Sequence, residues 1–431
     1  MYMETYGKIL LIAMPVFLFL VLFEKWYGWF RGRDTIRNMD MISSMSSGIT
    51  NVTKDVVGLS FVILSYPFFA RHLAIAHIQS SPAVYIIAFI SLDFAGYWVH
   101  RLQHVTNFFW NGHIIHHSSE EFNLACALRQ SISTIVRTFA IFLLPAALLG
   151  VPAAVIAVVA PLHLFSQFWY HTRHINKMGW LEKIIVTPSH HRVHHAINPV
   201  YIDKNYGQIF IFWDKLFGTY QEELKEVPPV YGITRPVQTW NPVKINFQHA
   251  LLLFKDAWFT KNWKDKLRIW VMPTGWRPAD RAEKFPVYKI EDVYNFEKYN
   301  PKTSTALTVW CWFQFLVMLG FISYLFGNIA VINALNPYFI YVYAAFVFAS
   351  VYAYTELMDR NPLAIVWETL KNAFGISFIY NQGDWFGSTR YSLWINYIII
   401  SYFMGSTIIT LLFTYRHLQE DRPVITANPP A

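Results

Sequence analysis

The sequence predicts an all-α, multi-pass integral membrane protein that carries a histidine-rich helical metal domain at the cytoplasmic face of the membrane. Of its 431 residues, 54% are hydrophobic and 14% are charged, whereas about a quarter of the residues in a soluble domain are charged. Its apolar runs have the length that a helix needs to cross a bilayer. Twelve of the sixteen histidines fall between residues 100 and 195, so one region of the chain concentrates the side chains that bind metals.

The amino-terminal segment, residues 1–82, is expected to consist of transmembrane helices. An apolar run over residues 8–23 follows a start that has neither a basic segment nor a small-residue cleavage site, which predicts a retained helix. A second span is predicted over residues 55–70 and a third over residues 83–99. The first run is followed by four basic residues, Lys25, Arg31, Arg33 and Arg37. The positive-inside rule places them in the cytoplasm, so the third span returns the chain to that side.

Three groups of closely spaced histidines predict metal binding. Residues three and four apart share one face of a helix, so each group presents its imidazoles in one direction. Neutral imidazole suits zinc, copper, iron and nickel. A tetrahedral ion takes four ligands, and the groups together offer about twice that number, which predicts two metal ions. The predicted ligands are His100, His104, His113, His116, His117, His171, His191, His194 and His195.

Other polar residues are candidates for a supporting role. Asp93 lies two helical turns before His100 inside the third span, with Tyr97 between them, and a carboxylate there needs a partner. It either orients a ligand imidazole through the second ring nitrogen or makes a structural hydrogen bond to a neighbouring helix, with direct ligation as a third possibility. His174, His190 and Asp203 are further supporting candidates. The isolated histidines are expected to be ordinary core or interfacial residues: His72, His77, His249 and His417.

The middle of the chain is expected to hold the histidine core and an amphipathic segment. In the core, residues 83–235, the apolar run from 135 to 168 predicts two short helices that turn around Gly150. Residues 236–304 are interpreted as an interfacial or cytoplasmic segment. Its basic, Trp-rich helix lies either in the membrane interface or against the histidine core.

The carboxy-terminal part carries no motif that indicates chemistry. Residues 305–415 are predicted to hold transmembrane helices, with spans over 306–327, 331–354 and 392–414 and with residues 363–380 left open. Residues 416–431 are predicted to form a disordered tail. This part could shape a lipid pocket, help assembly or brace the core.

Composition and motifs restrict the partners. The formal charge of +8 comes from basic residues beside apolar spans, which indicates contact with lipid and not with nucleic acid. Cys126 and Cys311 are too far apart to suggest a disulfide framework or a zinc ribbon. The chain has no dinucleotide-binding motif and no cysteine set for an iron–sulfur cluster, so electrons must come from an external donor. Arg129 and Arg192 could meet an acidic donor or a lipid headgroup, although pairing with Glu120 or Glu121 is the simpler interpretation.

The ordered motifs HxxxH, HxxHH and a later HxxHH resemble those of the fatty acid hydroxylase and sterol desaturase superfamily of membrane di-iron oxygenases. The first is His100/His104, the second begins at His113 and the third ends at His195. Within that superfamily the chain resembles the alkylglycerol monooxygenases in particular, over roughly residues 30–235. The segments that carry this resemblance are 113–123, 127–131, 167–172, 187–195, 202–207 and 212–220.

The resemblance implies a dioxygen-dependent hydroxylase of a lipid, with two iron ions held by the nine histidines as catalytic ligands. An oxygen atom would enter an unactivated C–H bond of an alkyl chain held in a dry apolar channel. Beside a glycerol ether oxygen, the product would be a hemiacetal that collapses to a fatty aldehyde and glycerol. A sterol, carotenoid or sphingolipid hydroxylase or desaturase is an alternative, and a non-catalytic membrane metal-binding protein is another.

The resemblance leaves the electron donor open. In the animal members, a carboxylate directly follows the first histidine pair and is linked to the use of tetrahydrobiopterin, whereas this chain has Val105 at that position. The reductant is therefore either tetrahydrobiopterin or a separate electron-transfer protein. The expected location is the bacterial cytoplasmic membrane or the endoplasmic reticulum, with the metal site facing the cytoplasm.

Overall fold

The computed structural model describes residues 2–59, 61–62, 65–134, 136–137 and 139–420. Over these residues the regular structure is helical apart from one pair of two-residue strands, so the predicted all-α class is confirmed. The chain divides into two compact units. We call one the histidine unit (Met14–Gln238 and Val243–Tyr299) and the other the C-terminal unit (Met1–Ala13, Thr239–Pro242 and Asn300–Ala431).

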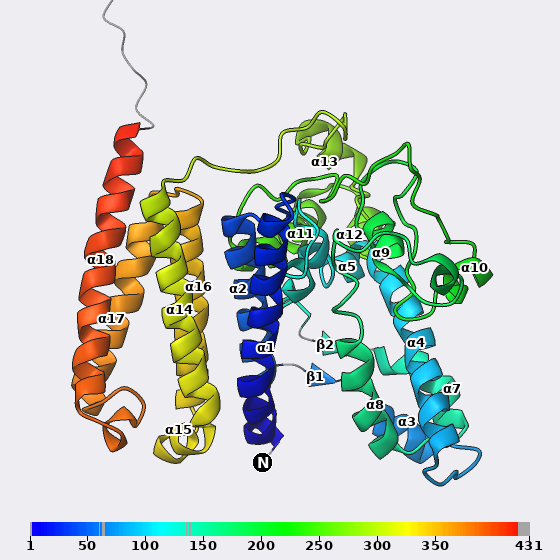
Figure 1. Cartoon of the computed structure of the whole chain (residues 1–431), viewed down its shortest axis with the longest axis horizontal. Coiled ribbons are helices and arrows are strands. Elements are labelled where there is room, and N and C mark those ends of the chain that lie inside the picture. Colours follow the sequence, from blue (N-terminus) through cyan, green and yellow to red (C-terminus); the bar gives the residue numbers. More distant parts are fainter. Residues whose placement is uncertain (1, 60, 63–64, 135, 138, 421–431) are drawn as a thin grey trace, which may run out of the picture. The chain divides into compact units, whose positions relative to one another are not determined.

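The histidine unit contains one long apolar helix that ends at the predicted ligands, α4 (Pro82–Val105), and many short elements around it (Figure 1). The strands β1 (Phe61–Val62) and β2 (Val136–Arg137) pair in parallel. The helices before α4 are α1 (Tyr2–Phe30), α2 (Asn38–Val56) and α3 (Tyr66–Leu73). Those after it are α5 (Asn107–Trp110), α6 (Ile114–His117), η1 (Cys126–Leu128), η2 (Phe139–Leu143), α7 (Leu144–Leu148), α8 (Ala153–Phe165), η3 (Gly179–Lys183), α9 (Pro188–His194), α10 (Phe212–Leu216), α11 (Pro242–Phe259), α12 (Trp263–Arg268) and α13 (Ala279–Lys284).

Among the described residues, five helices are long and apolar enough to cross a membrane, so the chain is a multi-pass membrane protein, as predicted. They correspond to the spans expected over residues 8–23, 83–99, 306–327, 331–354 and 392–414. The first part of the fourth expected span forms a separate short helix, α15 (Ile329–Leu335). The five helices are Glu4–Phe30, Pro82–Val105, Thr305–Gly327, Phe339–Met358 and Trp394–Glu420.

The span predicted over residues 55–70 is wrong. α2 ends at Val56, and the chain passes through β1 to α3, which has eight residues. A helix of that length is about 12 Å long and cannot cross a bilayer of about 30 Å. Gly58, with φ +71°, and Pro67, in the first turn of α3, interrupt the apolar run. In Figure 1, α4 then runs from α3 at one end of the histidine unit towards α5 and α9 at the other.

α7 and α8 form the hairpin that the sequence predicts. Gly150 adopts φ +74° in the turn, and a Cβ atom there would lie 1.8 Å from the carbonyl oxygen of Ala76, so only glycine fits. Both helices pack with α3 and α4 through small and branched apolar side chains. This core includes Val84, Ala88, Ala95, Ala146, Ala147, Val151, Val155 and Val159. It fixes α4 and thereby the histidines at the end of that helix.

α11 and α12 occupy the segment that the sequence identifies as amphipathic. From Val243 on, α11 buries Ile245 and Leu253 within the histidine unit and exposes large apolar side chains on another face. One face therefore packs on the histidine core, which is one of the two expected interpretations. The exposed apolar residues of α11 and α12 include Leu251, Phe254, Trp258, Trp263 and Leu267. They suit a membrane interface, and that role stays a prediction.

The C-terminal unit is a bundle of long helices that pack side by side (Figure 1). Its principal helices are α14 (Thr305–Gly327), α16 (Phe339–Met358), α17 (Ala364–Gln382) and α18 (Trp394–Glu420), and η4 (Ser388–Arg390) connects the last two. α17 fills the segment that sequence analysis leaves open. The disordered tail predicted from residue 416 is wrong for residues 416–420, which continue α18 with an i,i+4 ion pair between Arg416 and Glu420 (2.9 Å). Residues 421–431 lie outside the described residues.

Candidate metal centre

The structure brings all nine predicted ligands together in one buried region of the histidine unit. α4 supplies His100 and His104 at its end, and the short helix α6, with the residue before it, supplies the HxxHH group. α9 starts at a capping box between Thr187 and His190, with Pro188 in its first turn. This arrangement satisfies the amide groups at the start of α9 and fixes its histidines. His171 joins them from the segment after α8.

The first group has five members: His100, His104, His113, His117 and His194. Their candidate ligand atoms all lie within 4.8 Å of one another. The Nε2 atoms of His100 and His113 are 2.9 Å apart, and His117 Nε2 lies 3.1 Å from the Nε2 atoms of both His104 and His194. The nitrogen atoms thus point at a common centre and not at solvent.

The second group has four members: His116, His171, His191 and His195. The Nε2 atoms of His171 and His191 are 2.9 Å apart, and His195 Nε2 lies 3.1 Å from the Nε2 atoms of both His191 and His116. The Nε2 atoms of His171 and His116 are 3.4 Å apart. The two groups are neighbours, because the rings of His117 and His195 stack with centroids 4.2 Å apart. Each group offers enough ligands for one metal ion, so the arrangement fits two adjacent ions.

Backbone carbonyl groups orient several of these rings. His100 Nδ1 lies 2.8 Å from the Tyr206 oxygen, His194 Nδ1 lies 2.9 Å from the Lys204 oxygen, and His171 Nδ1 lies 3.1 Å from the Gln167 oxygen. A carbonyl oxygen only accepts, so Nδ1 of each ring donates and the Nε2 atom carries a lone pair. This is the support that metal-binding histidines ordinarily have.

Burial keeps the imidazoles neutral. Desolvation lowers the pKa of His171 to about 4. Burial first, and neighbouring imidazoles second, lower the pKa values of the other histidines outside α4 well below the usual value. These histidines are His113, His116, His117, His191, His194 and His195. Protons therefore cannot relieve the repulsion between the lone pairs near neutral pH, and a cation at each centre would. The donor set fits two metal ions.

Two supporting candidates in α4 act on the scaffold. The Asp93 carboxylate accepts hydrogen bonds from the backbone amides of Ile209 (2.8 Å) and Phe210 (3.1 Å), from the indole of Trp213 (2.9 Å) and from His163 Nε2 (2.9 Å). Of the two principal interpretations of Asp93, the structure favours the structural hydrogen bond. Tyr97 likewise bonds Thr219 Oγ1 (2.9 Å). Both residues fasten the 206–219 loop to α4, and that loop supplies the carbonyl group that receives His100.

The other three supporting candidates lie in different places. The Asp203 carboxylate lies 3.6 Å from His104 Nδ1, next to the first group. His190 receives the amide of Thr187 (3.3 Å) and so supports the start of α9. His174 contacts Thr35 Oγ1 (3.2 Å) and the ring of Tyr27, so it ties the segment after α8 to the end of α1.

The expected pairing of Arg129 and Arg192 with Glu120 or Glu121 is wrong. Arg129 is buried and donates to Asp40 Oδ1 (2.7 Å) and Ser118 Oγ (2.7 Å). Arg192 pairs with Glu223 (2.7 Å). Sequence reasoning missed Asp40 because α2 brings it to Arg129 from 89 positions away. The sequence feature that could have indicated Asp40 is its carboxylate within the Ser-rich segment that forms the buried helix α2.

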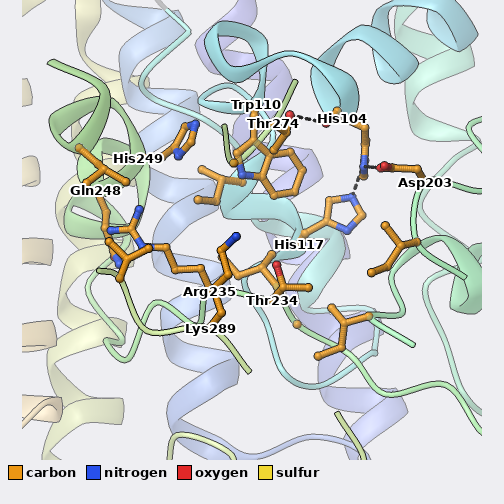
Figure 2. Close-up of a pocket in the computed structure, with 18 of the residues that line it drawn as sticks. His104, Trp110, His117, Asp203, Thr234, Arg235, Gln248, His249, Thr274 and Lys289 are labelled. Atoms are coloured by element: carbon orange, nitrogen blue, oxygen red, sulfur yellow. Dashed lines mark hydrogen bonds and ion pairs between the residues drawn. The ribbon is translucent and has the colours of Figure 1, made fainter. Parts of the chain in front are cut away.

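A cavity of about 230 Å³ adjoins the first group (Figure 2). Its wall near the histidines includes His104, His117, His194 and His195, together with Asp203. His249, expected to be an ordinary core or interfacial residue, is buried at 5% exposure and lines another part of the same cavity. Apolar side chains cover much of the rest: Trp110, Ile114, Ile197, Ile202, Ile233, Leu252, Leu253, Trp276 and Val287.

A membrane-helix scaffold that places two neighbouring histidine groups at the end of one span defines a class of integral membrane metal enzymes. Comparison with known proteins identifies the family. The Fatty acid hydroxylase family model matches residues 85–219, which include all nine predicted ligands. The chain is 35% identical to the alkylglycerol monooxygenase of Homo sapiens over 365 residues, which cover 83% of this chain and 80% of that protein. The chain belongs to the fatty acid hydroxylase family and is an oxidoreductase of that superfamily.

Further relatives show how the similarity is distributed. The alkylglycerol monooxygenase of Xenopus tropicalis is 33% identical over 83% of this chain and 79% of its own length. An ornithine lipid hydroxylase of Rhizobium tropici is 28% identical over 35% of this chain and 46% of its own length. No solved structure matches the chain.

Proposed function

We propose that this chain is a di-iron monooxygenase that oxidises the carbon next to the ether oxygen of alkylglycerols, releasing a fatty aldehyde and glycerol. The observation that carries the proposal is the convergence of nine neutral imidazoles into two adjacent groups. The substrate class is supported by the relatives named alkylglycerol monooxygenase, which are similar over most of the chain. The ligand roles of the nine histidines are part of this proposal.

The proposed reaction balances with one external two-electron donor. Dioxygen, two electrons and two protons react with the ether lipid; one oxygen atom enters the C–H bond and the other leaves as water. The resulting hemiacetal then breaks its carbon–oxygen bond to the glycerol, with the hydroxyl proton transferred to the leaving oxygen. The two iron ions, when bound, supply the activation of dioxygen that no amino-acid side chain provides.

The residues of the chain would hold, orient and enclose the reactants. The backbone carbonyl groups that receive Nδ1 of His100, His171 and His194 keep the Nε2 atoms aimed at the two centres. The apolar side chains of the cavity exclude water from the reacting carbon. Asp203, whose carboxylate lies beside His104 on the cavity wall, is placed to take up and return the proton of the hemiacetal hydroxyl.

The donor and the membrane face complete the proposal. Val105 is 38% exposed at the end of α4, where a pterin-linked carboxylate is expected from the resemblance. We keep both tetrahydrobiopterin and an electron-transfer protein as donors. Arg37 lies after the first span, and its Nε is 3.1 Å from Glu121 Oε1. Glu121 follows the second histidine motif closely in the sequence. The positive-inside rule therefore supports a cytoplasmic metal site, in a bacterial cytoplasmic membrane or the endoplasmic reticulum.

The test is fatty-aldehyde formation from an alkylglycerol in membranes that contain this chain, with and without tetrahydrobiopterin. His194→Ala serves as the inactive control. We expect aldehyde that depends on His194 and on one of the two donors. Absence of aldehyde with either donor, in protein shown to contain two irons, would reject alkylglycerols. The search would then move to the sterol, carotenoid and sphingolipid alternatives.

A further inference from the structure

The cavity beside the first histidine group has a second, cationic end. Arg235 and Lys289 line it, together with the amide of Gln248. Within the part of the chain that the structure describes, the side chains of these three residues make no hydrogen bond or ion pair. His249 lies beside them with its ring buried, and its Nε2 atom has no hydrogen-bond partner among the described residues. Buried polar atoms are rarely left unpaired, so this end is suited to a ligand.

No described carboxylate neutralises Arg235. Asp256 acts on it electrostatically, but the Asp256 carboxylate is already engaged by Arg277, at 2.5 and 3.1 Å, and by Arg281 at 3.5 Å. One negative charge is thus shared by two other guanidinium groups. The cavity end keeps an excess of positive charge, and low-dielectric walls strengthen its attraction for an anion.

The two ends of the cavity carry different charged side chains. Figure 2 draws Arg235, Gln248 and His249 on one side and His104, His117 and Asp203 on the other. Asp203 is the acidic residue of the lining, and it stands at the histidine end. Arg235 and Lys289 therefore attract a negatively charged group to the end of the cavity away from the histidines, and the rest of an amphiphilic ligand held there can extend towards the metal centre.

We propose that this cationic end binds a phosphate on the headgroup of the lipid substrate, with Arg235 as its principal contact. The inference rests on the proposed function and narrows it, because the preferred substrate becomes an alkylglycerol that carries a phosphomonoester. With the phosphate held by Arg235, the glycerol ether carbon faces His104 and His117.

The number and kind of donors favour phosphate over carboxylate. Arg235 offers a planar fork, Lys289 an ammonium group, and Gln248 the N–H groups of its amide. Such a set matches the several oxygen atoms of a phosphate, whereas a carboxylate has only two. The cavity volume of about 230 Å³ is below the range of roughly 300–1,000 Å³ that encloses a drug-sized ligand. It therefore suits a headgroup and not a whole alkyl chain.

The test compares hexadecyl glyceryl ether with its phosphomonoester, using the iron-loaded full chain in detergent micelles. Wild type is expected to have the higher kcat/KM with the phosphomonoester. Arg235→Gln should lower that value by about 10- to 100-fold, the size expected for a lost charge-assisted hydrogen bond, and the neutral ether should lose much less. Lys289→Gln, at an exposed side chain, should change the ratio in the same direction. Equal losses for both substrates in both variants would overturn the proposal.

The matched control is Lys225→Gln, which removes one positive charge from an exposed position away from the cavity. Its substrate ratio should equal that of wild type. A ratio that falls as far as in Arg235→Gln would show that general surface charge, and not the cavity, attracts the lipid phosphate.

Equilibrium binding of hexadecyl phosphate, a lipid that has no ether to cleave, separates this proposal from the proposed function. Binding that Arg235→Gln weakens supports the phosphate site even if neither substrate gives aldehyde, a result that would reject only the ether-cleaving activity. Aldehyde formation without hexadecyl phosphate binding would overturn the phosphate site alone. A second binding experiment measures competition by inorganic phosphate. If inorganic phosphate displaces hexadecyl phosphate at equal concentration, the site binds a free anion and the lipid assignment is wrong.

Discussion

The histidine unit and the C-terminal unit both bury polar side chains among helices, but they satisfy them differently. In the C-terminal unit, α17 pairs a buried cation with a buried anion. The Lys371 ammonium lies 2.8 Å from the Glu368 carboxylate, and the Asn372 amide donates to Glu368 Oε1 (3.1 Å) and Ser406 Oγ (2.9 Å). In the histidine unit, imidazole nitrogens of the same kind approach one another at 2.9 to 3.4 Å.

This difference teaches that burial of polar groups does not by itself mark a functional site. The buried ion pair in α17 needs no further ligand, because the Lys371 and Glu368 charges already complement one another. The neutral imidazoles of His100, His171 and His194 use their N–H on backbone carbonyl groups, so they direct Nε2 lone pairs at the group centres, where a cation fits. The first two predictions compare the histidine groups, which require a ligand, with the Lys371–Glu368 pair, which we call the complete set.

The largest expected effect comes from removing one ligand of either histidine group. His194→Ala in the first group and His116→Ala in the second should each lower turnover by more than about 100-fold, because loss even of groups that only support metal ligands costs up to about that factor. Steady-state aldehyde formation is the measurement. His77→Ala, at an exposed histidine outside both groups, is the control and should be fully active. Normal turnover in either ligand variant would remove that residue from the ligand set.

Breaking the complete set in α17 should affect stability and leave the metal centre intact. Lys371→Met leaves the Glu368 carboxylate buried without its ammonium partner, which typically costs about 3–5 kcal/mol of unfolding free energy. Denaturant unfolding in micelles measures this loss, and Glu368→Gln combined with Lys371→Met should recover most of it. Iron lost from protein that remains folded would contradict the separation of the two sets.

Sequence reasoning identified the nine histidines that the fold brings together, but not their division into two groups. The three- and four-residue spacings identify nine histidines because local helix geometry decides which imidazoles share a face. Their division into five and four depends on how α4, α6 and α9 converge, and no local pattern records this. The same limit explains the wrong partner of Arg129: Asp40 reaches it through the packing of α2.

Backbone breaks and the cavity were equally hard to foresee. The predicted span over 55–70 is apolar enough, but the left-handed Gly58 and the proline at the start of α3 end helices that hydropathy alone would join. The cationic cavity end combines Arg235, Gln248 and Lys289 from separate segments. No periodicity links such residues, so only the folded chain shows that they face one cavity.

Acid should destabilise the metal-free protein through its histidine unit. Burial lowers the pKa of His171 to about 4, and burial with the nearby Arg235 lowers the pKa of His249 to about 4. The unfolded chain binds protons near the ordinary value of about 6.5, so stability is full above that pH and is lost as the pH falls towards 4, by roughly 3 kcal/mol for each histidine. Thermal melting across this range measures the loss.

His249→Gln tests the source of this pH dependence. It removes one titrating group without removing a predicted metal ligand, so the melting temperature should fall less steeply on acidification. The C-terminal unit contains one histidine, His417, and should contribute little. An unchanged slope in His249→Gln would assign the acid sensitivity to other groups.

The smallest expected effect concerns the electron donor. Val105→Glu restores a carboxylate directly after the first histidine pair and should raise turnover supported by tetrahydrobiopterin, with little change in stability because the side chain is partly exposed. Val105→Gln, similar in size and uncharged, is the control. No change in pterin-supported turnover would deny this position a role in pterin use.

The measurement that tests the central claim most directly is the metal stoichiometry of the purified full chain, by elemental analysis after iron loading. We expect two irons per wild-type chain. His194→Ala and His116→Ala should each fall towards one, because each disables a different group, and Lys371→Met should retain two per folded chain. A single iron in wild type, or two irons in both histidine variants, would contradict the assignment of two separate metal sites to the two groups.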